Sequence, residues 1–461
     1  MTRAFQLLFA MIIAGFLFAY FSIATRIDPL YAGTHFLIIG LALWHITRLK
    51  RFNLGASFSF FALFFFGFIP LFEYKLNITY SGASAARDSS YLFAGILALL
   101  SSVSFYLGYG LDRGSPMKVV TLGELRYLSR RHRQIVIAAA VIAIAALSAG
   151  IALYFELDVG NMLFRGFAEQ LELSAFGYSA ISFFVRPLLF NLIFLILLIR
   201  ARQRGSFDVA TYTLCMLLLV FVSPVGIPRT LTGALYIPLL MLVFFPRLIS
   251  TYSVVCVIIF AVLLVAPIAD IFRSVQAGPT VDLLSNFNLD YAFSGHFDAF
   301  FNLTQVVDLS YSSAGLQVMG ALLFWIPRAI WPGKPVGTSF DFADYAGLSA
   351  HNVSFPLTAE LYVDFGIFGV LLGMYILGLI YRRLDAYLSK PRECGSLFSY
   401  LAPIAHLELS ILGIYLLRGS FLSSFAFTVG VASTFAVLGF FNAVLRGFES
   451  RRFRNRDAVK A

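Results

Sequence analysis

Long apolar runs recur along the whole chain, and they constrain its fold more than any other feature. Each holds close to the roughly 20 apolar residues that an α-helix needs to cross a bilayer. Unpaired backbone groups are costly in lipid, so each run should be a helix or part of a closed barrel, and barrel strands would alternate over about 10 residues. We predict twelve spans, near 5–24, 31–47, 56–74, 91–111, 134–154, 179–199, 209–224, 230–246, 250–268, 357–380, 398–417 and 421–445. The sequence therefore predicts an all-α polytopic membrane protein, folded as a single integral membrane domain over residues 1–461.

The charged residues predict how this membrane domain is oriented. Lysine and arginine number 34 against 24 acidic residues, a net charge of +10. The basic clusters fall in loops on one side of the predicted spans, and basic loops stay in the cytoplasm. Both termini should therefore face the cytoplasm, with residues 446–461 as a basic cytoplasmic tail. We attribute the positive charge to membrane orientation and expect no nucleic-acid partner.

One large polar loop, residues 269–356, should lie on the opposite, outer side of the membrane, and we expect it to carry much of the active site. Its segment Ala314 to Ile330 is apolar and contains Trp325, so it should re-enter the bilayer edge or lie along it. The loop ends close to Glu360, at the start of the next predicted span.

Several basic residues lie on the outer side, against the charge bias. They are Arg186, Arg229, Arg273, Arg328, Lys334 and Arg418. One interpretation is that each snorkels to the headgroups or pairs with a nearby carboxylate. The other is that they form a cradle for an anion, because guanidinium groups match phosphate oxygens two at a time. A diphosphate at the outer leaflet is the ligand that this cradle would suit.

Two residues could activate an acceptor hydroxyl. His351 has a side chain suited to general-base catalysis near neutral pH, although it could equally be an ordinary loop histidine. Glu360 could deprotonate a sugar hydroxyl, orient His351, or stabilise a helix N-terminus together with Asp364, one turn further on. We find no metal-binding or nucleotide-binding motif, and the three cysteines have no CxxC spacing. We therefore expect neither a metal nor a cofactor.

Two motifs lie at the end of the large loop and in the span that follows it: Trp325-Ile-Pro-Arg-Ala-Ile-Trp-Pro-Gly-Lys-Pro335 and Pro356-Leu-Thr-Ala-Glu-Leu-Tyr-Val-Asp-Phe-Gly366-Ile-Phe-Gly369. They resemble the signature stretch of Wzy-type oligosaccharide repeat-unit polymerases, the family of the O-antigen and enterobacterial common antigen polymerases. Arg51-Phe-Asn-Leu before the third span, Arg229 at the start of a span and Leu417-Arg-Gly-Ser420 between the last two spans resemble the family as well. The chain departs from a second family motif, since Leu240 stands where a glycine would follow Arg229 by eleven residues.

The resemblance implies a metal-independent glycosyltransferase with a multi-helix fold of the GT-C-like kind, in the bacterial inner membrane. Such enzymes transfer a growing glycan from undecaprenyl diphosphate to a newly flipped lipid-linked repeat unit, on the periplasmic face. Arg229, Arg328 and Arg418 would hold the diphosphate, with Arg273 and Lys334 as further cations. His351 and Glu360 fall in the region that activates the acceptor. The expected partners are undecaprenyl-diphosphate-linked oligosaccharides and membrane lipid, and a chain-length regulator is a candidate because family members usually work beside one.

Two alternatives stay open at this stage. An O-antigen ligase uses the same lipid diphosphate donor with a lipid A core acceptor. A flippase or other transporter of lipid-linked oligosaccharides would more commonly show internal repeats and broken helices at the midplane. We find no internal repeat in the sequence. The residues specify neither the sugars nor whether the anomeric configuration is retained or inverted.

Overall fold

The apolar runs form helices in the computed structural model of the chain, because a helix satisfies every backbone group within its own segment. The structure describes residues 2–24, 27–111, 130–164, 175–204, 208–246, 249–262, 297–351, 353–390 and 397–460. Within these ranges the regular secondary structure is helical throughout. Eight helices there are long and apolar enough to cross a membrane: Pro29–Arg48, Leu54–Lys75, Asp88–Gly110, His132–Tyr154, Gly177–Ala201, Leu357–Leu388, Leu397–Arg418 and Phe421–Val444.

For the described residues, the prediction of a helical protein with several helices long and apolar enough to cross a membrane is therefore confirmed. Four more predicted spans coincide with shorter apolar helices, namely Ala4–Leu17, Val209–Phe221, Arg229–Phe244 and Thr251–Phe260. The total of twelve spans, their orientation and the GT-C-like character stay predictions.

The chain forms two compact units. Unit 1 comprises Met1–Pro116, Arg247–Tyr387 and Leu409–Thr428, and unit 2 comprises Met117–Pro246, Leu388–Glu408 and Val429–Ala461. Two helices, α19 (Leu397–Arg418) and α20 (Phe421–Lys460), contribute residues to both units. The backbone of α20 stays helical through the basic segment that we predicted as a tail.

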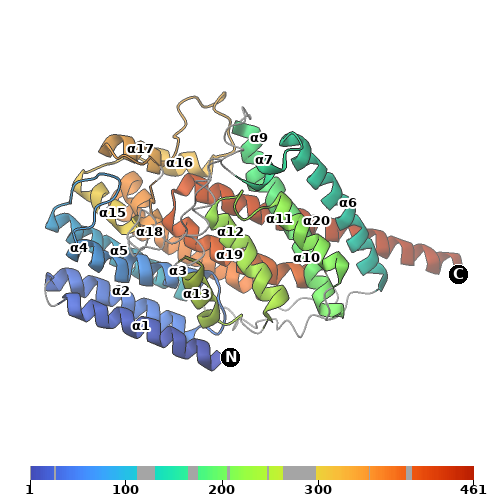
Figure 1. The fold of residues 1–461 in the computed structure, drawn as a ribbon, viewed down its shortest axis with the longest axis horizontal. Helices are drawn as coiled ribbons and strands as arrows, with labels where there is room; N and C mark the ends of the chain where they lie inside the picture. Colours follow the sequence, from blue (N-terminus) through green and yellow to red (C-terminus); the bar gives the residue numbers. More distant parts are fainter. Residues whose placement is uncertain are drawn as a thin grey trace. The chain divides into compact units, whose positions relative to one another are not determined.

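Unit 1 contains α1 (Thr2–Ala24), α2 (Pro29–Arg48), α3 (Leu54–Phe61), the π-helical segment η1 (Ala62–Phe68), α4 (Ile69–Lys75), α5 (Asp88–Leu111), α13 (Thr251–Phe260), α15 (Ala299–Asp308), α16 (Leu316–Leu322), α17 (Thr338–Ala346) and most of α18 (Leu357–Leu388). Helix α2 packs against α5 and η1, and α15 packs against α5 (Figure 1). Tyr31 of α2, Phe66 of η1 and Phe300 of α15 meet in one aromatic core. Helix α15 lies in the predicted periplasmic loop, yet it is largely buried, so this part of the loop belongs to the folded core.

Small residues let α5 and α18 approach closely. A Cβ at Gly108 would lie 2.1 Å from the carbonyl oxygen of Tyr375, and one at Gly378 would lie 2.3 Å from that of Phe105. Backbone-to-backbone contact of this kind is typical of helix pairs in membranes. The crossing fixes α18 against the core of unit 1.

Capping residues explain where the third span begins. Asn53 accepts a hydrogen bond from the Ala56 backbone N–H at 2.8 Å. The buried Asp385 carboxylate accepts hydrogen bonds from the N–H groups of Leu54 at 3.1 Å and Gly55 at 3.2 Å. These acceptors satisfy backbone donors that the first turn of a helix leaves unpaired.

The first turns of α18 are separated from its main part by a break at Gly366, whose φ of 64° and ψ of −155° are non-helical. A Cβ at Gly369 would lie 2.5 Å from the carbonyl oxygen of Leu361, and one at Gly373 would lie 2.7 Å from the Leu361 side chain. The two glycines of the GxxxG motif at 369–373 thus leave room for Leu361, in the segment of the same chain that precedes them. This arrangement places Glu360 at the start of α18.

Unit 2 contains α6 (Arg130–Tyr154), α7 (Val159–Leu163), α9 (Ala175–Ala180), η3 (Ile181–Val185), α10 (Arg186–Arg204), α11 (Val209–Phe221), α12 (Arg229–Leu239) and η4 (Leu240–Phe244). Helix α10 lies beside α6 and α11 (Figure 1). Asn191 of α10 donates hydrogen bonds to Glu408 of α19 at 3.2 Å and to Thr434 of α20 at 3.0 Å. This buried polar triad links three apolar helices within the unit.

Candidate functional site

Glu360 joins two segments that lie far apart in the sequence. Its side chain is fully buried. One carboxylate oxygen accepts a hydrogen bond from the Thr338 hydroxyl, and the other accepts one from the Phe421 N–H at 2.8 Å. Thr338 and Phe421 are the first residues of α17 and α20, so one carboxylate lies at two helix N-termini, where negative charge is favourable. The Glu360 carboxylate has no exposed surface, and both of its oxygens have protein donors. Its role in activating the acceptor stays a prediction.

The turn before α20 also packs closely against the segment before α17. Gly337 has φ of +123°, and a Cβ there would lie 3.3 Å from the Ser420 hydroxyl. Glycine is required here by the backbone conformation and by the short distance. The Glu360 junction therefore connects the loop that carries Arg328 and Lys334 with the turn that carries Arg418.

Arg418 is paired with a buried acid that we did not predict from the sequence. Its guanidinium lies 3.7 Å from Oδ1 of Asp298, and only 20% of the Arg418 side chain is exposed, against 2% for Asp298. The guanidinium also lies over the Phe65 ring, 5.6 Å from its centroid. Asp298 thus places a buried negative charge beside the guanidinium, and a fifth of the Arg418 side chain stays exposed.

Asp298 is itself fixed by hydrogen bonds. Its Oδ2 accepts from the Asn302 amide at 3.0 Å and from the Ser354 N–H at 3.1 Å. Burial raises the pKa of the Asp298 carboxyl, and the positive charge of Arg418 and the two hydrogen bonds oppose that shift without cancelling it. The sequence held one signal for this residue, an aspartate directly before a short apolar helix, but its pairing with a residue 120 positions away has no local signature.

Arg328 and Lys334 brace the loop between α16 and α17. Arg328 donates to the carbonyl oxygens of Lys334 at 2.6 Å and Pro335 at 3.1 Å. The Lys334 amine donates to the carbonyl oxygens of Phe324 and Ile326. Partial burial and the neighbouring charge of Arg328 lower the pKa of Lys334. Both cations are therefore held close together by the loop's own backbone.

His351 pairs with Asp344. Its Nδ1 lies 2.8 Å from Oδ1 of Asp344, and both side chains are more than half exposed. This contact leaves Nε2 as the ring nitrogen that could accept a proton when Nδ1 carries the hydrogen. Asp344, and not Glu360, is thus the carboxylate that orients His351 in this structure.

The other predicted cations are distributed differently. Arg229 is the first residue of α12 and belongs to unit 2, and Arg273 lies outside the residues that the structure describes. Arg186, also in unit 2, is buried, donates to the carbonyl oxygens of Gly226 at 3.1 Å and Met162 at 3.2 Å, and thereby ties two loops together. For Arg186 these contacts match the structural interpretation better than the anion cradle.

Asp364 caps α16. It accepts a hydrogen bond from the Val318 N–H at 2.6 Å and another from the Ser313 hydroxyl. This contact gives Asp364 a structural role at a helix N-terminus, on α16 rather than on its own helix. Within the ranges that are described, no group of three or more His, Cys, Asp or Glu side chains could hold a metal ion.

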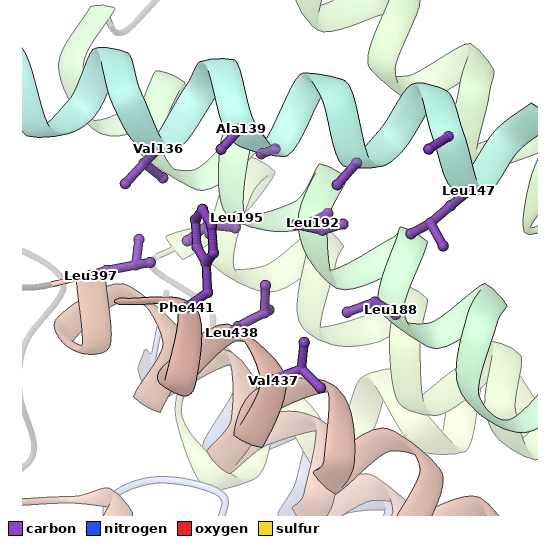
Figure 2. Close-up of a pocket in the computed structure, with 13 residues that line it drawn as sticks. Val136, Ala139, Leu147, Leu188, Leu192, Leu195, Leu397, Val437, Leu438 and Phe441 are labelled. Carbon is purple, nitrogen blue, oxygen red and sulfur yellow. The ribbon is translucent and has the colours of Figure 1, made fainter. Parts of the chain in front are cut away.

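Unit 2 contains an apolar cavity of about 320 Å³. Its lining side chains come from α6, α10, α19 and α20 and include Val136, Leu192, Leu397 and Phe441 (Figure 2). The lining residues are all hydrophobic, so the cavity could accommodate only an apolar group. None of the predicted site residues lines it.

No protein-family model, no curated protein and no solved structure matches this chain. The family resemblance of residues 325–335 and 356–369 accordingly stays a prediction.

Proposed function

We propose that the protein is a membrane glycosyltransferase that polymerises undecaprenyl-diphosphate-linked oligosaccharide repeat units on the periplasmic face of the inner membrane. The observation that carries this proposal is the Glu360 junction. It connects the braced cationic loop of Arg328 and Lys334 with the turn of Arg418, whose direction Asp298 fixes. Cations held in fixed directions suit a lipid diphosphate, whose charge grows as it leaves.

In the proposed reaction, an acceptor sugar hydroxyl attacks the anomeric carbon of the donor glycan. The new bond joins the acceptor oxygen to that carbon, and the bond from the carbon to the diphosphate oxygen breaks. The bonding electrons stay on the diphosphate, which the arginines neutralise. The acceptor proton passes to Nε2 of His351, whose opposite nitrogen contacts Asp344. The products are the lengthened glycan on the acceptor lipid and free undecaprenyl diphosphate.

The test is polymerisation by the purified protein in vesicles, with lipid-linked repeat units as the substrate and glycan ladders on a gel as the readout. Removing a stabilising donor typically costs about 10²–10³-fold in rate, so Arg328→Ala and Arg418→Ala should leave mostly single repeats. His351→Ala should lose about 10²–10⁴-fold if it is the base. Arg87→Ala is a matched control, because Arg87 is 70% exposed and pairs with Asp308 on the surface.

Three outcomes would reject the proposal. Normal ladders from all the arginine variants would exclude the cradle. In cells that lack the protein, intact ladders with failed transfer to the lipid A core would indicate a ligase. Repeat units trapped in the inner leaflet of cells that lack the protein would indicate a flippase.

A further inference from the structure

Helix α16 presents its large apolar side chains outward. Leu316, Met319 and Leu322 are each at least half exposed, and Trp325, three residues further on, is 67% exposed. The spacing of three places Leu316, Met319 and Leu322 along one stripe of the helix surface, and Trp325 follows just after the end of the helix. The opposite side is buried and consists of Gln317, Gly320 and Ala321. This pattern is the inverse of a helix that packs its large apolar residues into a protein core.

The exposed stripe does not belong to a loose segment. Asp364 of α18 holds the first turn of α16 through the Val318 N–H. Gly320 faces Pro335 so closely that a Cβ would lie 3.1 Å from the proline ring. Phe324, next to Trp325, contacts the Phe425 ring of α20 at 6.1 Å between centroids. The stripe is therefore a fixed surface on unit 1.

Neighbouring residues connect this stripe with the surface of a predicted span. Gly315, at the start of α16, lies against the Phe365 ring, since a Cβ there would be 3.2 Å from it. Phe365 and Phe368 of α18 are both exposed, Phe368 by 85%. Only 39% of the apolar window of α18 is buried inside the protein, so most of this helix should face lipid. The exposed face of α16 thus borders a surface that hydrocarbon would cover.

Along the chain, the apolar stripe is followed first by a tryptophan and then by two cations, which is the order of layers from acyl chains to headgroups in a membrane interface. Trp325 comes directly after the stripe, and tryptophan is enriched at the boundary between headgroups and acyl chains. The cations Arg328 and Lys334 lie next along the chain and close to each other. Anionic phosphates of the headgroups would complement them.

From this arrangement we infer that α16 and Trp325 form an interfacial anchor that lies in the outer leaflet of the bilayer, with the stripe on acyl chains and Arg328 and Lys334 at the depth of the lipid phosphates. The partner is the lipid surface itself. The inference uses the predicted orientation of the chain but not the proposed reaction. If both hold, the anchor sets the cationic loop at the depth where a lipid-linked diphosphate lies.

Fluorescence quenching tests the anchor directly, because the chain has only three tryptophans. The variant Trp44→Phe with Trp331→Phe leaves Trp325 as the sole emitter. It is reconstituted into vesicles of phosphatidylcholine brominated either near the headgroup or near the chain ends. We expect the larger loss of Trp325 emission with bromine near the headgroup, and little loss with acrylamide in the water.

The control keeps Trp44 alone, which lies in the predicted span α2 and should be quenched by brominated lipid. A second variant adds Leu322→Asp to the Trp325 protein and should shift quenching from lipid towards acrylamide, since it places a charge on the stripe. Strong acrylamide quenching of Trp325 with no effect of either brominated lipid would overturn the anchor. Polymerisation is measured on the unsubstituted protein in the same kind of vesicles. An inactive unsubstituted protein together with lipid-quenched Trp325 would reject the reaction and leave the anchor standing.

Discussion

The buried pair of Asp298 and Arg418 gives the sharpest prediction, because two substitutions of the same residue should separate stability from function. Asp298→Ala removes the acceptor for the Ser354 N–H and the partner of the Arg418 guanidinium. Breaking a buried ion pair by removing one partner costs about 3–5 kcal/mol, and we expect the low end, about 3 kcal/mol, because a fifth of the Arg418 side chain is exposed.

Asp298→Asn should behave differently. The amide keeps an acceptor for the Ser354 N–H but removes the negative charge. Burial raises the pKa of Asp298 despite Arg418, which means that the folded state binds the carboxyl proton more tightly than the unfolded state does. A carboxyl with a raised folded pKa supports the fold at pH values below its unfolded pKa, and that support is lost as pH rises through the folded pKa. At neutral pH the free energy of unfolding of the Asn variant should therefore lie within about 1 kcal/mol of the wild-type value.

The two variants should nevertheless share a functional defect, because neither offers Arg418 a charged partner. The measurement is thermal unfolding in detergent together with polymerisation in vesicles, where 1 kcal/mol corresponds to a shift of about 2 °C or less for a chain this long. An Ala variant as stable as the wild type would refute the reasoning that the buried pair of Asp298 and Arg418 stabilises the fold. An Asn variant with full activity would show that Asp298 does not direct Arg418.

Two further predictions concern the scaffold. Gly108→Ala should cost about 1–3 kcal/mol in thermal unfolding, because its Cβ would lie 2.1 Å from the Tyr375 carbonyl oxygen, whereas Gly110→Ala, with no atom within 4 Å, should be tolerated. Equal stability of the two variants would contradict the close crossing of α5 and α18. Glu408→Gln should keep the hydrogen bond with Asn191, and Glu408→Leu should cost about 1 kcal/mol, the scale of a hydrogen bond between membrane helices. A Gln variant less stable than the Leu variant would show that the hydrogen bond between Asn191 and residue 408 does not stabilise the unit.

The helices could be predicted from the sequence where length and apolar content decide the structure. The predicted span 31–47 corresponds to Pro29–Arg48, and 134–154 corresponds to Arg130–Tyr154. Lipid imposes this result, because a long apolar segment has few other ways to satisfy its backbone. The π-helical segment η1 inside the third span had no such signal, since its backbone departs from the α-helix without a change in composition.

The buried helix α15 shows the opposite situation. Its ten residues are too few for a span, and they include polar side chains that a loop would equally contain. They are buried because distant backbone groups satisfy them, as when Asn302 donates to the Ser354 carbonyl oxygen at 2.7 Å and Gln305 to that of Ser84 at 2.8 Å. Partners 52 and 221 residues away leave no periodic pattern in the sequence.

The candidate site shows the same difference between features with a local sequence signal and contacts made by distant residues. The cations were visible in the sequence because they defy the charge bias, and Glu360 was visible at the start of a predicted span. Asp298 and Asp344, which contact Arg418 and His351, were not distinguishable from other loop carboxylates. Asp298 directs Arg418, Asp344 contacts His351, and Glu360 joins the two cationic segments. Among the described residues of unit 1, therefore, Arg328, Lys334, Arg418 and His351 each contact either an acid or backbone carbonyl oxygens. A group held in advance has little reorganisation left when charge develops on a substrate, and this preorganisation is what the proposed transfer of a glycan from a lipid diphosphate requires.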